Sequence, residues 1–297
     1  MSGITGSWRG TQPNADLHCH STVSDGWHTP SEVVRRAAAN GVELLALTDH
    51  DEVGGVAEAA KVATEFGMAF VGGVEISVSY GDETVHVLGL GIDHREPRLN
   101  AGLARLRAGR DERARRIADA LAAVGIPAAL EGARRHARNP ELVSRAHFAR
   151  HIVAAGIMPD VNTVFRYYLA RGKPGYVEHQ WVALEEAVEW INGAGGIAVI
   201  AHPARYRLSE AQFDRLLDRF TAEGGAGIEV VTGAHTEAEM LRFASVARRR
   251  GLLASRGSDF HGVGESAVDL GCCNPLPEDL EPVWTRLTLQ ADLPVAR

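Results

Sequence analysis

The chain has 297 residues, of which 45% are hydrophobic and 23% charged, and its formal net charge is −7, a composition ordinary for a globular protein. It is long enough for one large domain or for a core with an inserted subdomain, and no apolar run approaches the length of a membrane span. Three cysteines make no disulfide framework, and the N-terminus lacks the basic and apolar regions of a secretion signal, so we expect a cytoplasmic protein.

Positive charge is concentrated in the middle of the chain. Residues 101–175 contain thirteen Arg and one Lys against six acidic residues, a balance of +8, so the remainder carries −15. An acidic body can hold divalent cations while a basic segment approaches an anionic substrate. The alternative is a solvated, arginine-rich helical surface. For the stretch 105–116, which also contains Asp111 and Glu112, a salt-bridged helix is favoured over an RNA-binding track.

Residues 15 to 94 alternate between patterns typical of strands and of helices. Two histidines in the run Asp16-Leu17-His18-Cys19-His20-Ser21 are two positions apart, which in an extended strand turns both imidazoles to one face and Cys19 to the other. A capping box from Thr29 to Glu32 predicts the start of the next helix, and Asn40-Gly41 its end. A strand at 43–48, a helix at 55–66, a strand at 69–74 that ends in Glu75, and a hairpin that turns at Gly81-Asp82 follow.

The pattern changes in the second third of the chain. From about 99 to 171 it is helical, without a convincing strand. The alternation then resumes, with helices at 184–194, 209–223 and 236–250 and strands at 197–200, 227–231 and 252–255. Repeated βα units with short connections indicate a parallel sheet, either open or closed into a barrel, and we favour a barrel interrupted by a helical insert.

Histidines and acids follow the predicted strands, at the ends where chemistry gathers in α/β folds. They are His50, Glu75, His202, Asp259 and His261, together with Asp25 in the loop after the first strand and His86 on the hairpin. Any one of them could be a hydrogen-bonded or capping group, and His202-Pro203 could simply end a strand. Their shared placement favours a metal centre. Mixed imidazole and carboxylate ligands suit Mn²⁺, Fe²⁺ or Zn²⁺, whereas calcium prefers oxygen ligands.

The segments D-L-H-C-H-S, T-D-H-D, G-V-E-I-S, A-H-P and S-D-F-H resemble the motifs of the polymerase and histidinol phosphatase (PHP) family. Within it, residues 14 to 275 are similar to the branch of 3′,5′-nucleoside bisphosphate phosphatases that also act as 5′-to-3′ exoribonucleases. The resemblance implies an α/β fold, a distorted (β/α)7 barrel with a helical insertion subdomain. The barrel would comprise residues 14–98 and 177–290, and the insert, residues 99–176, would cover the active site.

The resemblance also implies a centre of two or three divalent metal ions. The first ion would be bound by His18, His20, Glu75 and Asp259, the second by Glu75, His86 and His202, and the third by Asp25, His50 and His261. Asp25, His50, Glu75 and His202 are the implied catalytic residues. Asp16 and Asp49 adjoin ligand histidines in sequence, so they either orient imidazoles or make ordinary loop or strand-end hydrogen bonds.

Two segments of the insert resemble those that cover the metal site in this branch, and they supply candidate substrate contacts. Arg145 can bind a phosphate through its planar guanidinium, Lys173 can add a point charge, and His147 can hydrogen-bond the same phosphate. Solvated helix or loop positions are the alternative for all three. Further candidates for the pocket are His179, Arg205 and Tyr206, the last by stacking on a base. Without a partner pattern, His28, His94, His136, His151 and His235 are interpreted as structural or exposed.

These features predict a metal-dependent phosphoesterase in which hydroxide held by the metals attacks phosphorus. The expected substrate is a nucleoside 3′,5′-bisphosphate, cut at the 3′-phosphate, or the 5′ end of a short RNA. A cyclic-phosphate diesterase and a histidinol-type phosphatase are alternatives that could share the metal site. A different class, a metal-stabilised binding or regulatory domain without turnover, also stays open. No sequence feature indicates a membrane or an obligate protein partner.

Overall fold

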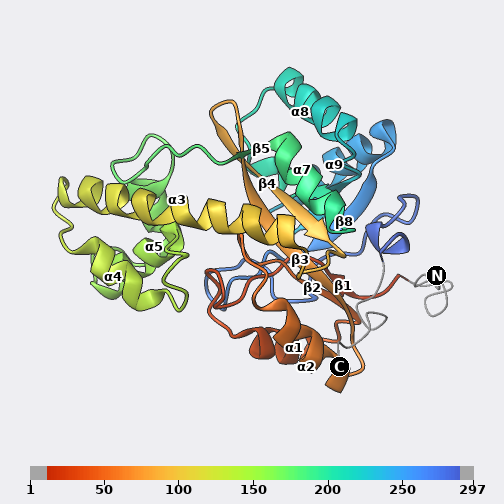
Figure 1. The fold of residues 1–297 in the computed structure, drawn as a ribbon, viewed down its shortest axis with the longest axis horizontal. Helices are drawn as coiled ribbons and strands as arrows, with labels where there is room; N and C mark the ends of the chain where they lie inside the picture. Colours follow the sequence, from red (N-terminus) through yellow and green to blue (C-terminus); the bar gives the residue numbers. More distant parts are fainter. Residues whose placement is uncertain (1–11, 288–297) are drawn as a thin grey trace.

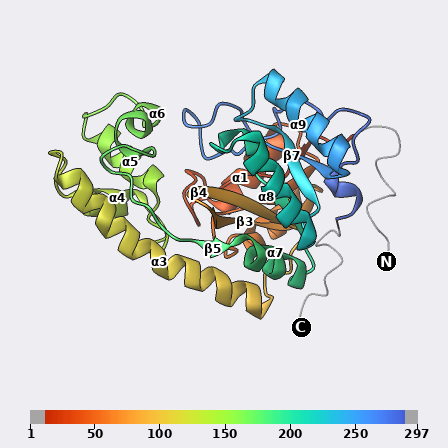
Figure 2. The ribbon, with the colours of Figure 1, turned by 90° about the horizontal axis from the view of Figure 1, so that it is seen from above.

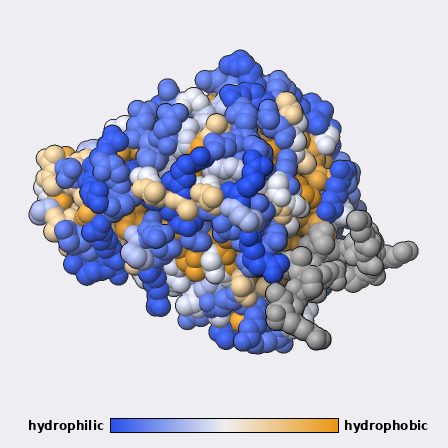
Figure 3. Space-filling view, in the orientation of Figure 1, coloured by the Kyte–Doolittle hydropathy of each residue, from blue (hydrophilic) through white to orange (hydrophobic). Residues whose placement is uncertain are grey.

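The structure is a computed structural model that describes residues 12–287. The N-terminal residues considered for a secretion signal, and residues 288–290 of the predicted second barrel part, lie outside this range. Within it, no helix combines the length and hydrophobicity that crossing a membrane requires. In the orientation of Figure 3 the surface is largely hydrophilic, with hydrophobic residues in scattered patches.

Seven strands form a nearly closed barrel (Figure 1). The ring closes beyond the last strand, because Leu17 N donates to Arg256 O at 3.0 Å and His20 N to Phe260 O at 2.9 Å. The predicted α/β fold, a distorted (β/α)7 barrel, is therefore confirmed. In spatial order the strands are β1 (Ala15–Asp16), β2 (Leu44–Leu47), β3 (Ala69–Tyr80), β4 (Glu83–Leu90), β6 (Ile197–Ile200), β7 (Gly227–Thr232) and β8 (Leu253–Gly257).

The hairpin of β3 and β4 distorts the barrel, because β4 runs antiparallel to both of its neighbours. The turn at Gly81, whose φ is 57°, is where the sequence predicted it. The predicted strand end at Glu75 is wrong: β3 continues through it to Tyr80 and pairs with β4 from Gly73↔Leu90 to Tyr80↔Glu83. Beyond Glu75, β3 stays fully buried through Val78, and the short strand β5 (Val182–Ala183) pairs with its far end.

Five helices connect the barrel strands, each within two residues of its predicted bounds. Capping boxes at Thr29, Ser209 and Thr236 define three of the helix starts, since each side chain accepts a hydrogen bond from the backbone N–H three residues on. One continuous hydrophobic core joins these helices to the strands. The helices are α1 (Pro30–Ala39), α2 (Val56–Glu65), α7 (Leu184–Gly193), α8 (Glu210–Ala222) and α9 (Glu237–Arg250).

Helices also make up the segment predicted as an insert, which lies to one side of the barrel (Figures 1 and 2). They are α3 (Pro97–Ala122), α4 (Ala129–His136), α5 (Arg145–Ala154), α6 (Val161–Val164) and a π-helix, η2 (Phe165–Leu169). A second hydrophobic core, formed by residues between Ala114 and Val177, holds them together. The first turns of α3 belong instead to the barrel core, where Gly102 packs so closely on Trp190 that a Cβ would lie 2.6 Å from its ring. The long helix α3 is therefore shared by both cores.

Candidate metal centre

All nine residues predicted as metal ligands come together at one place in the structure. Four overlapping groups of His, Asp and Glu have potential ligand atoms within 4.8 Å of one another, and within the described range these groups contain the nine residues and no others. They are His18, His20, Asp25, His50, Glu75, His86, His202, Asp259 and His261. Cys19 points away from them, as strand alternation predicts, and its Sγ donates to Ala46 O at 3.3 Å.

Glu75 lies at the centre of this arrangement and is fully buried. Its Oε1 lies 2.8 Å from His86 Nδ1 and 2.9 Å from His202 Nε2, and its Oε2 lies 2.9 Å from His50 Nδ1. The Nε2 atoms of His18 and His20 lie 3.4 and 3.3 Å from the same Oε2. Burial alone would raise the pKa of this carboxyl, but the imidazoles around it, first that of His50, hold the pKa well below its usual range. One ionised carboxylate therefore contacts five imidazoles.

Asp259 approaches the two histidines of the first strand from the loop after β8. Its Oδ1 lies 3.2 Å from His20 Nε2 and 3.4 Å from His18 Nε2, while Arg205 Nη2 lies 2.6 Å from its Oδ2. Burial would raise the pKa of Asp259, but Arg205 and His18 hold it well below the usual value. The backbone at Asp259 has a φ of 55°, a left-handed conformation that non-glycine residues adopt at a cost.

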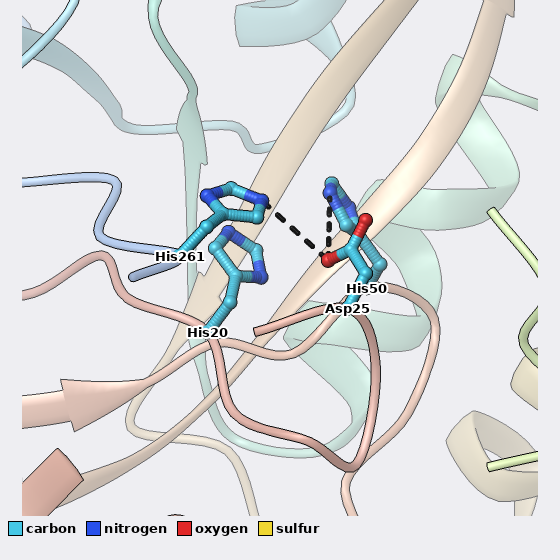
Figure 4. Close-up of side chains that lie close together, drawn as sticks. All are labelled: His20, Asp25, His50 and His261. Atoms are coloured by element: carbon cyan, nitrogen blue, oxygen red, sulfur yellow. Dashed lines mark ion pairs between the residues drawn. The ribbon is translucent and has the colours of Figure 1, made fainter. Parts of the chain in front are cut away.

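Asp25 lies between His50 and His261, with His20 beside them (Figure 4). Asp25 Oδ1 lies 3.5 Å from His261 Nε2 and 3.9 Å from His50 Nε2. The side chains of His50 and His261 are 14% and 20% exposed, whereas those of His18 and His20 are inaccessible to solvent. His50, His86 and His261 are thus the solvent-accessible histidines of the cluster, and all three line the pocket.

The cluster residues fit divalent cations because many of their buried polar atoms lack hydrogen bonds. Buried polar atoms in folded proteins nearly always have a hydrogen-bond partner. Here both ring nitrogens of His20, Nε2 of His18, Nδ1 of His50, Oδ1 of Asp25 and Oε2 of Glu75 make no hydrogen bond, although several of them face one another as close charged pairs. Burial, and next Arg205, lowers the pKa of His202 to about 3, so this imidazole is neutral, as a metal ligand must be.

The two acids considered as orienting residues make strand-end and loop hydrogen bonds instead. Asp16 accepts from the backbone N–H groups of Ser258 at 2.9 Å and Gly271 at 2.8 Å. Asp49 accepts from Ser21 N at 2.7 Å and from the hydroxyls of Ser21 and Ser24. Neither carboxylate contacts an imidazole through these bonds.

A residue that the sequence reasoning missed, Glu229, contacts the histidines directly. Its Oε1 lies 3.0 Å from His18 Nδ1, and its Oε2 accepts from His202 N at 2.6 Å. It is fully buried in the middle of β7, between Ile228 and Val230. A carboxylate inside a buried apolar strand requires partners, and that pattern was the available signal. Glu229 fixes the ring of His18 and the backbone of His202.

A pocket of about 770 Å³ connects the cluster with the insert. His50, His86 and Asp259 line it from the barrel, and Arg145 lines it from α5. Arg145 Nη1 donates only to a backbone carbonyl, that of Leu169, at 3.3 Å. The other two predicted substrate contacts lie elsewhere. His147 Nδ1 accepts from Ser144 N at 3.0 Å and thereby caps α5, and Lys173 is exposed on the loop after η2.

The three further pocket candidates differ from one another. Arg205 lines the pocket beside Asp259. The hydroxyl of Tyr206 donates to Ala201 O at 2.6 Å and accepts from His86 N at 3.0 Å, which ties the ends of β4 and β6 together. The ring of His179 packs on Trp181 at 4.3 Å. Tyr206 and His179 are not among the lining residues, so base stacking on Tyr206 has no support in this arrangement.

The family model of the PHP domain matches residues 16–233, and the protein therefore belongs to the PHP family. It is a metal-dependent phosphoesterase of that family, as the motifs predicted. Over 274 residues it is 55% identical to the 3′,5′-nucleoside bisphosphate phosphatase of Chromobacterium violaceum, covering 92% of this chain and 96% of that one. It is 41% identical to the 5′-3′ exoribonuclease Rnm of Escherichia coli over 271 residues, covering 91% and 92%.

A solved structure, that of an amidohydrolase from Chromobacterium violaceum with bound sulfate and no metal, has the same fold. It superposes with a TM-score of 0.89 at 55% identity, and the match covers 91% of this chain and 94% of that one.

Proposed function

We propose that the protein removes the 3′-phosphate from nucleoside 3′,5′-bisphosphates and also degrades short RNA from the 5′ end. One observation carries this proposal: a single pocket is lined both by residues of the histidine–carboxylate cluster and by Arg145, which forms no ion pair with a carboxylate of residues 12–287. The relatives at 55% and 41% identity act on these two kinds of substrate, which share a terminal 5′-phosphate.

The cluster would hold two or three divalent ions, with Mn²⁺, Fe²⁺ and Zn²⁺ as the candidates. His18, His20 and Asp259 with Glu75 would bind the first, Glu75 with His86 and His202 the second, and Asp25, His50 and His261 the third. Bound there, the ions supply a polarised water as nucleophile and neutralise charge on the phosphoryl oxygens. The central position of Glu75, with each of its oxygens close to at least two imidazoles, supports a bridging role.

The chain's own residues would then orient the substrate and the ligands. Glu229 holds the imidazole of His18, which fixes the direction of its free Nε2. Arg205, which lines the pocket beside Asp259, would contact the scissile phosphate. Arg145, which lines the pocket, would bind the 5′-phosphate. His147 and Lys173 were also predicted to contact it, but neither is among the residues that line the pocket. Asp25, His50, Glu75 and His202 remain the proposed catalytic residues, through the ions they hold.

We also propose that this reaction takes place in the cytoplasm. Cys19, Cys272 and Cys273 are free thiols in the structure, which suits a reducing compartment.

A phosphate-release panel tests the proposed substrate. We expect the metal-loaded protein to turn over adenosine 3′,5′-bisphosphate with a kcat/KM at least about tenfold above that for adenosine 3′-monophosphate, because only the bisphosphate can contact Arg145. Short RNA with a 5′-phosphate should likewise be preferred to RNA with a 5′-hydroxyl.

The same panel separates the alternatives. Equal turnover of the two adenosine phosphates contradicts a 5′-phosphate site. A preference for a cyclic phosphate or for histidinol phosphate favours the corresponding enzyme. A protein that hydrolyses nothing with Mn²⁺, Fe²⁺ and Zn²⁺ each supplied in excess favours the binding domain.

A further inference from the structure

Trp27 is an exposed indole in the loop that follows the first strand. It is 48% exposed, whereas the other tryptophans of residues 12–287, Trp181, Trp190 and Trp284, are 7% exposed or less. Tryptophan is highly buried on average, because its large apolar surface is costly to leave in water. An indole that is exposed and also held in a fixed position therefore calls for an explanation.

Three contacts fix the orientation of Trp27. Its backbone N–H donates to His261 O at 2.7 Å, and its Nε1 donates to Glu265 Oε1 at 2.6 Å. The guanidinium of Arg150 lies 4.6 Å from the ring centre and covers one face. Arg150 is itself held by Glu265 and by the backbone carbonyl of Asp25. The exposed area thus belongs mainly to the opposite face, which is ordered before any flat partner arrives.

The residues that hold Trp27 border the pocket, although Trp27 itself does not line it. Asp25, His261 and Glu265 are lining residues, and the first two are predicted metal ligands. Arg145, the proposed contact of the 5′-phosphate, lies against η2 instead. A substrate with its 5′-phosphate at Arg145 and its scissile phosphate on the cluster would therefore continue past the cluster, along the border that Trp27 forms.

The surface next to Trp27 is cationic as well as aromatic. The segment after α4 is anchored here, because Asn139 Nδ2 donates to Val23 O at 3.0 Å. Arg135 and Arg138 are exposed on this part of the insert, and neither forms an ion pair with an acid of residues 12–287. Proteins bind single-stranded nucleic acid with this combination of aromatic faces for the bases and cations for the backbone.

We propose that Trp27 stacks on the base of the second nucleotide of an RNA substrate, the nucleotide whose 5′ oxygen carries the scissile phosphate. This inference rests on the proposed function and deepens it, because it names a residue that distinguishes the two proposed substrates. A nucleoside 3′,5′-bisphosphate ends at the scissile phosphate and has no second base. Every base has a flat face, so the contact would serve RNA of any sequence.

Paired variants and paired substrates test the stacking contact. Phe66→Ala is the control for Trp27→Ala, because it removes a ring that is 52% exposed and does not line the pocket. With a 5′-phosphorylated adenosine trinucleotide, Trp27→Ala should lose about 5- to 100-fold in kcat/KM, the range of base–aromatic stacking. With adenosine 3′,5′-bisphosphate it should lose less than about threefold, since no second base is present. Phe66→Ala should resemble the wild type with both, and Trp27→Phe, which keeps a ring, should lose an intermediate amount.

An equal loss with both substrates would assign Trp27 a purely structural role and overturn the inference, as would no loss with either. Thermal unfolding of each variant identifies misfolding. If Trp27→Ala is misfolded, an abasic substrate decides with the wild-type protein alone.

The abasic substrate is the same trinucleotide without the base on its second sugar. The wild type should lose as much with it as Trp27→Ala loses with the intact trinucleotide. Trp27→Ala should turn over the two trinucleotides alike, since both changes remove one interaction. Losses that simply add, or a wild type that is indifferent to the base, would overturn the inference.

A binding measurement separates this inference from the proposed function. A trinucleotide with a methylphosphonate at its first internucleotide position resists hydrolysis, so its calorimetric Kd for the metal-loaded protein does not depend on turnover. We expect Trp27→Ala to weaken this Kd at least about fivefold relative to Phe66→Ala. If the wild type hydrolyses neither the bisphosphate nor RNA, the proposed function fails, and the Kd values still decide the stacking contact. Equal affinity of the two variants, or no binding by the wild type, overturns it.

Discussion

The two sides of the pocket use opposite chemistry. On the barrel side, three carboxylates lie among six imidazoles, and many of their polar atoms lack hydrogen bonds. On the insert side, Arg113 and Arg145 line the pocket, and neither forms an ion pair with an acid in the part of the chain that the structure describes. The barrel therefore offers ligands that bind cations, and the insert offers cations that bind anions. If the proposed function holds, the reaction would take place on the barrel side and the substrate would be selected on the insert side.

Two arginines of the insert join the sides. Arg110 forms a buried ion pair with Asp51, the residue after His50. Arg150 donates to Asp25 O at 2.6 Å and to both carboxylate oxygens of Glu265, at 2.8 and 2.7 Å, while its guanidinium lies over the ring of Trp27 at 4.6 Å. Both guanidinium groups contact Asp25 or the residue next to His50. They therefore join the insert directly to the segments that carry predicted metal ligands.

Removing Glu75 tests the barrel side alone and should have the largest effect. Glu75→Ala deletes the carboxylate near five imidazoles, so we expect hydrolysis of every substrate to fall on the order of 10³-fold or more. Bound metal, measured by elemental analysis, should fall with it. Glu178→Ala, at an exposed position, is the control. Activity within tenfold of the wild type would contradict the central role of Glu75.

Removing the metal should abolish activity in the same way as Glu75→Ala, but without a change in the sequence. A chelator should abolish turnover, and Mn²⁺, Fe²⁺ or Zn²⁺ added back singly should restore it and identify the preferred ion. Because the ions bind only the folded state tightly, loading at 100 times Kd should add about 2.7 kcal/mol to the free energy of unfolding, visible as a higher Tm. An unchanged Tm and full activity in the chelated protein would be the contrary result.

Arg110→Met removes the buried ion pair that joins the insert to the barrel at Asp51. It leaves the carboxylate of Asp51, which has no solvent exposure, without its buried partner. We expect the free energy of unfolding to fall by roughly 3–5 kcal/mol in denaturant titrations. Arg98→Met removes an ion pair whose side chains are 74% and 58% exposed and should change little. Similar free energies of unfolding for the two variants would show that the ion pair of Arg110 with Asp51 does not stabilise the fold.

Glu229→Gln tests whether a barrel residue that orients a metal ligand affects all substrates equally. The amide keeps the shape but loses the charge that orients His18, so metal affinity and kcat should fall about 10- to 100-fold. The loss should be the same for adenosine 3′,5′-bisphosphate and adenosine 3′-monophosphate, because Glu229 acts on the ligands and not on the 5′-phosphate. A loss confined to the bisphosphate would contradict a positioning role.

The smallest expected effect is a pH dependence of stability on the insert side. Burial lowers the pKa of His147 to about 4 from the ordinary 6.5, so between these values the unfolded chain binds a proton that the folded protein does not. The free energy of unfolding therefore falls as pH falls through this window, and His147 alone accounts for about 2 kcal/mol between pH 7 and pH 5. His147→Gln should reduce the loss by that amount in denaturant titrations at both pH values. Parallel curves for variant and wild type would rule out this contribution.

Much of the barrel could be predicted from the sequence because its signals are local. Period-two apolar runs and capping boxes such as Thr29–Glu32 placed strands and helices within a few residues. The strand through Glu75 was predicted too short, because an acid after an apolar run reads as a strand end. Only the pairing with β4 shows that the strand continues.

The metal ligands could be predicted from sequence motifs. The contacts that support them could not, because they join residues far apart in the sequence. Arg110 and Asp51 are 59 positions apart, and His18 and Glu229 are 211 apart. No pattern on α3 distinguishes Arg113, which lacks a carboxylate, from Arg110, which has one. Which arginine meets an acid is decided by how the insert packs on the barrel, and that is a tertiary property.

The closure of the ring between β1 and β8 has a consequence for the order of events during synthesis. Residues 114–177 can complete the insert core while the ribosome is still translating, since all of its contacts lie within one stretch. The first strand, by contrast, waits for Arg256 and Phe260, and the last predicted ligand, His261, follows directly. The full set of nine predicted ligands can therefore assemble only after the last strand has been made, when the core of the insert can already be complete.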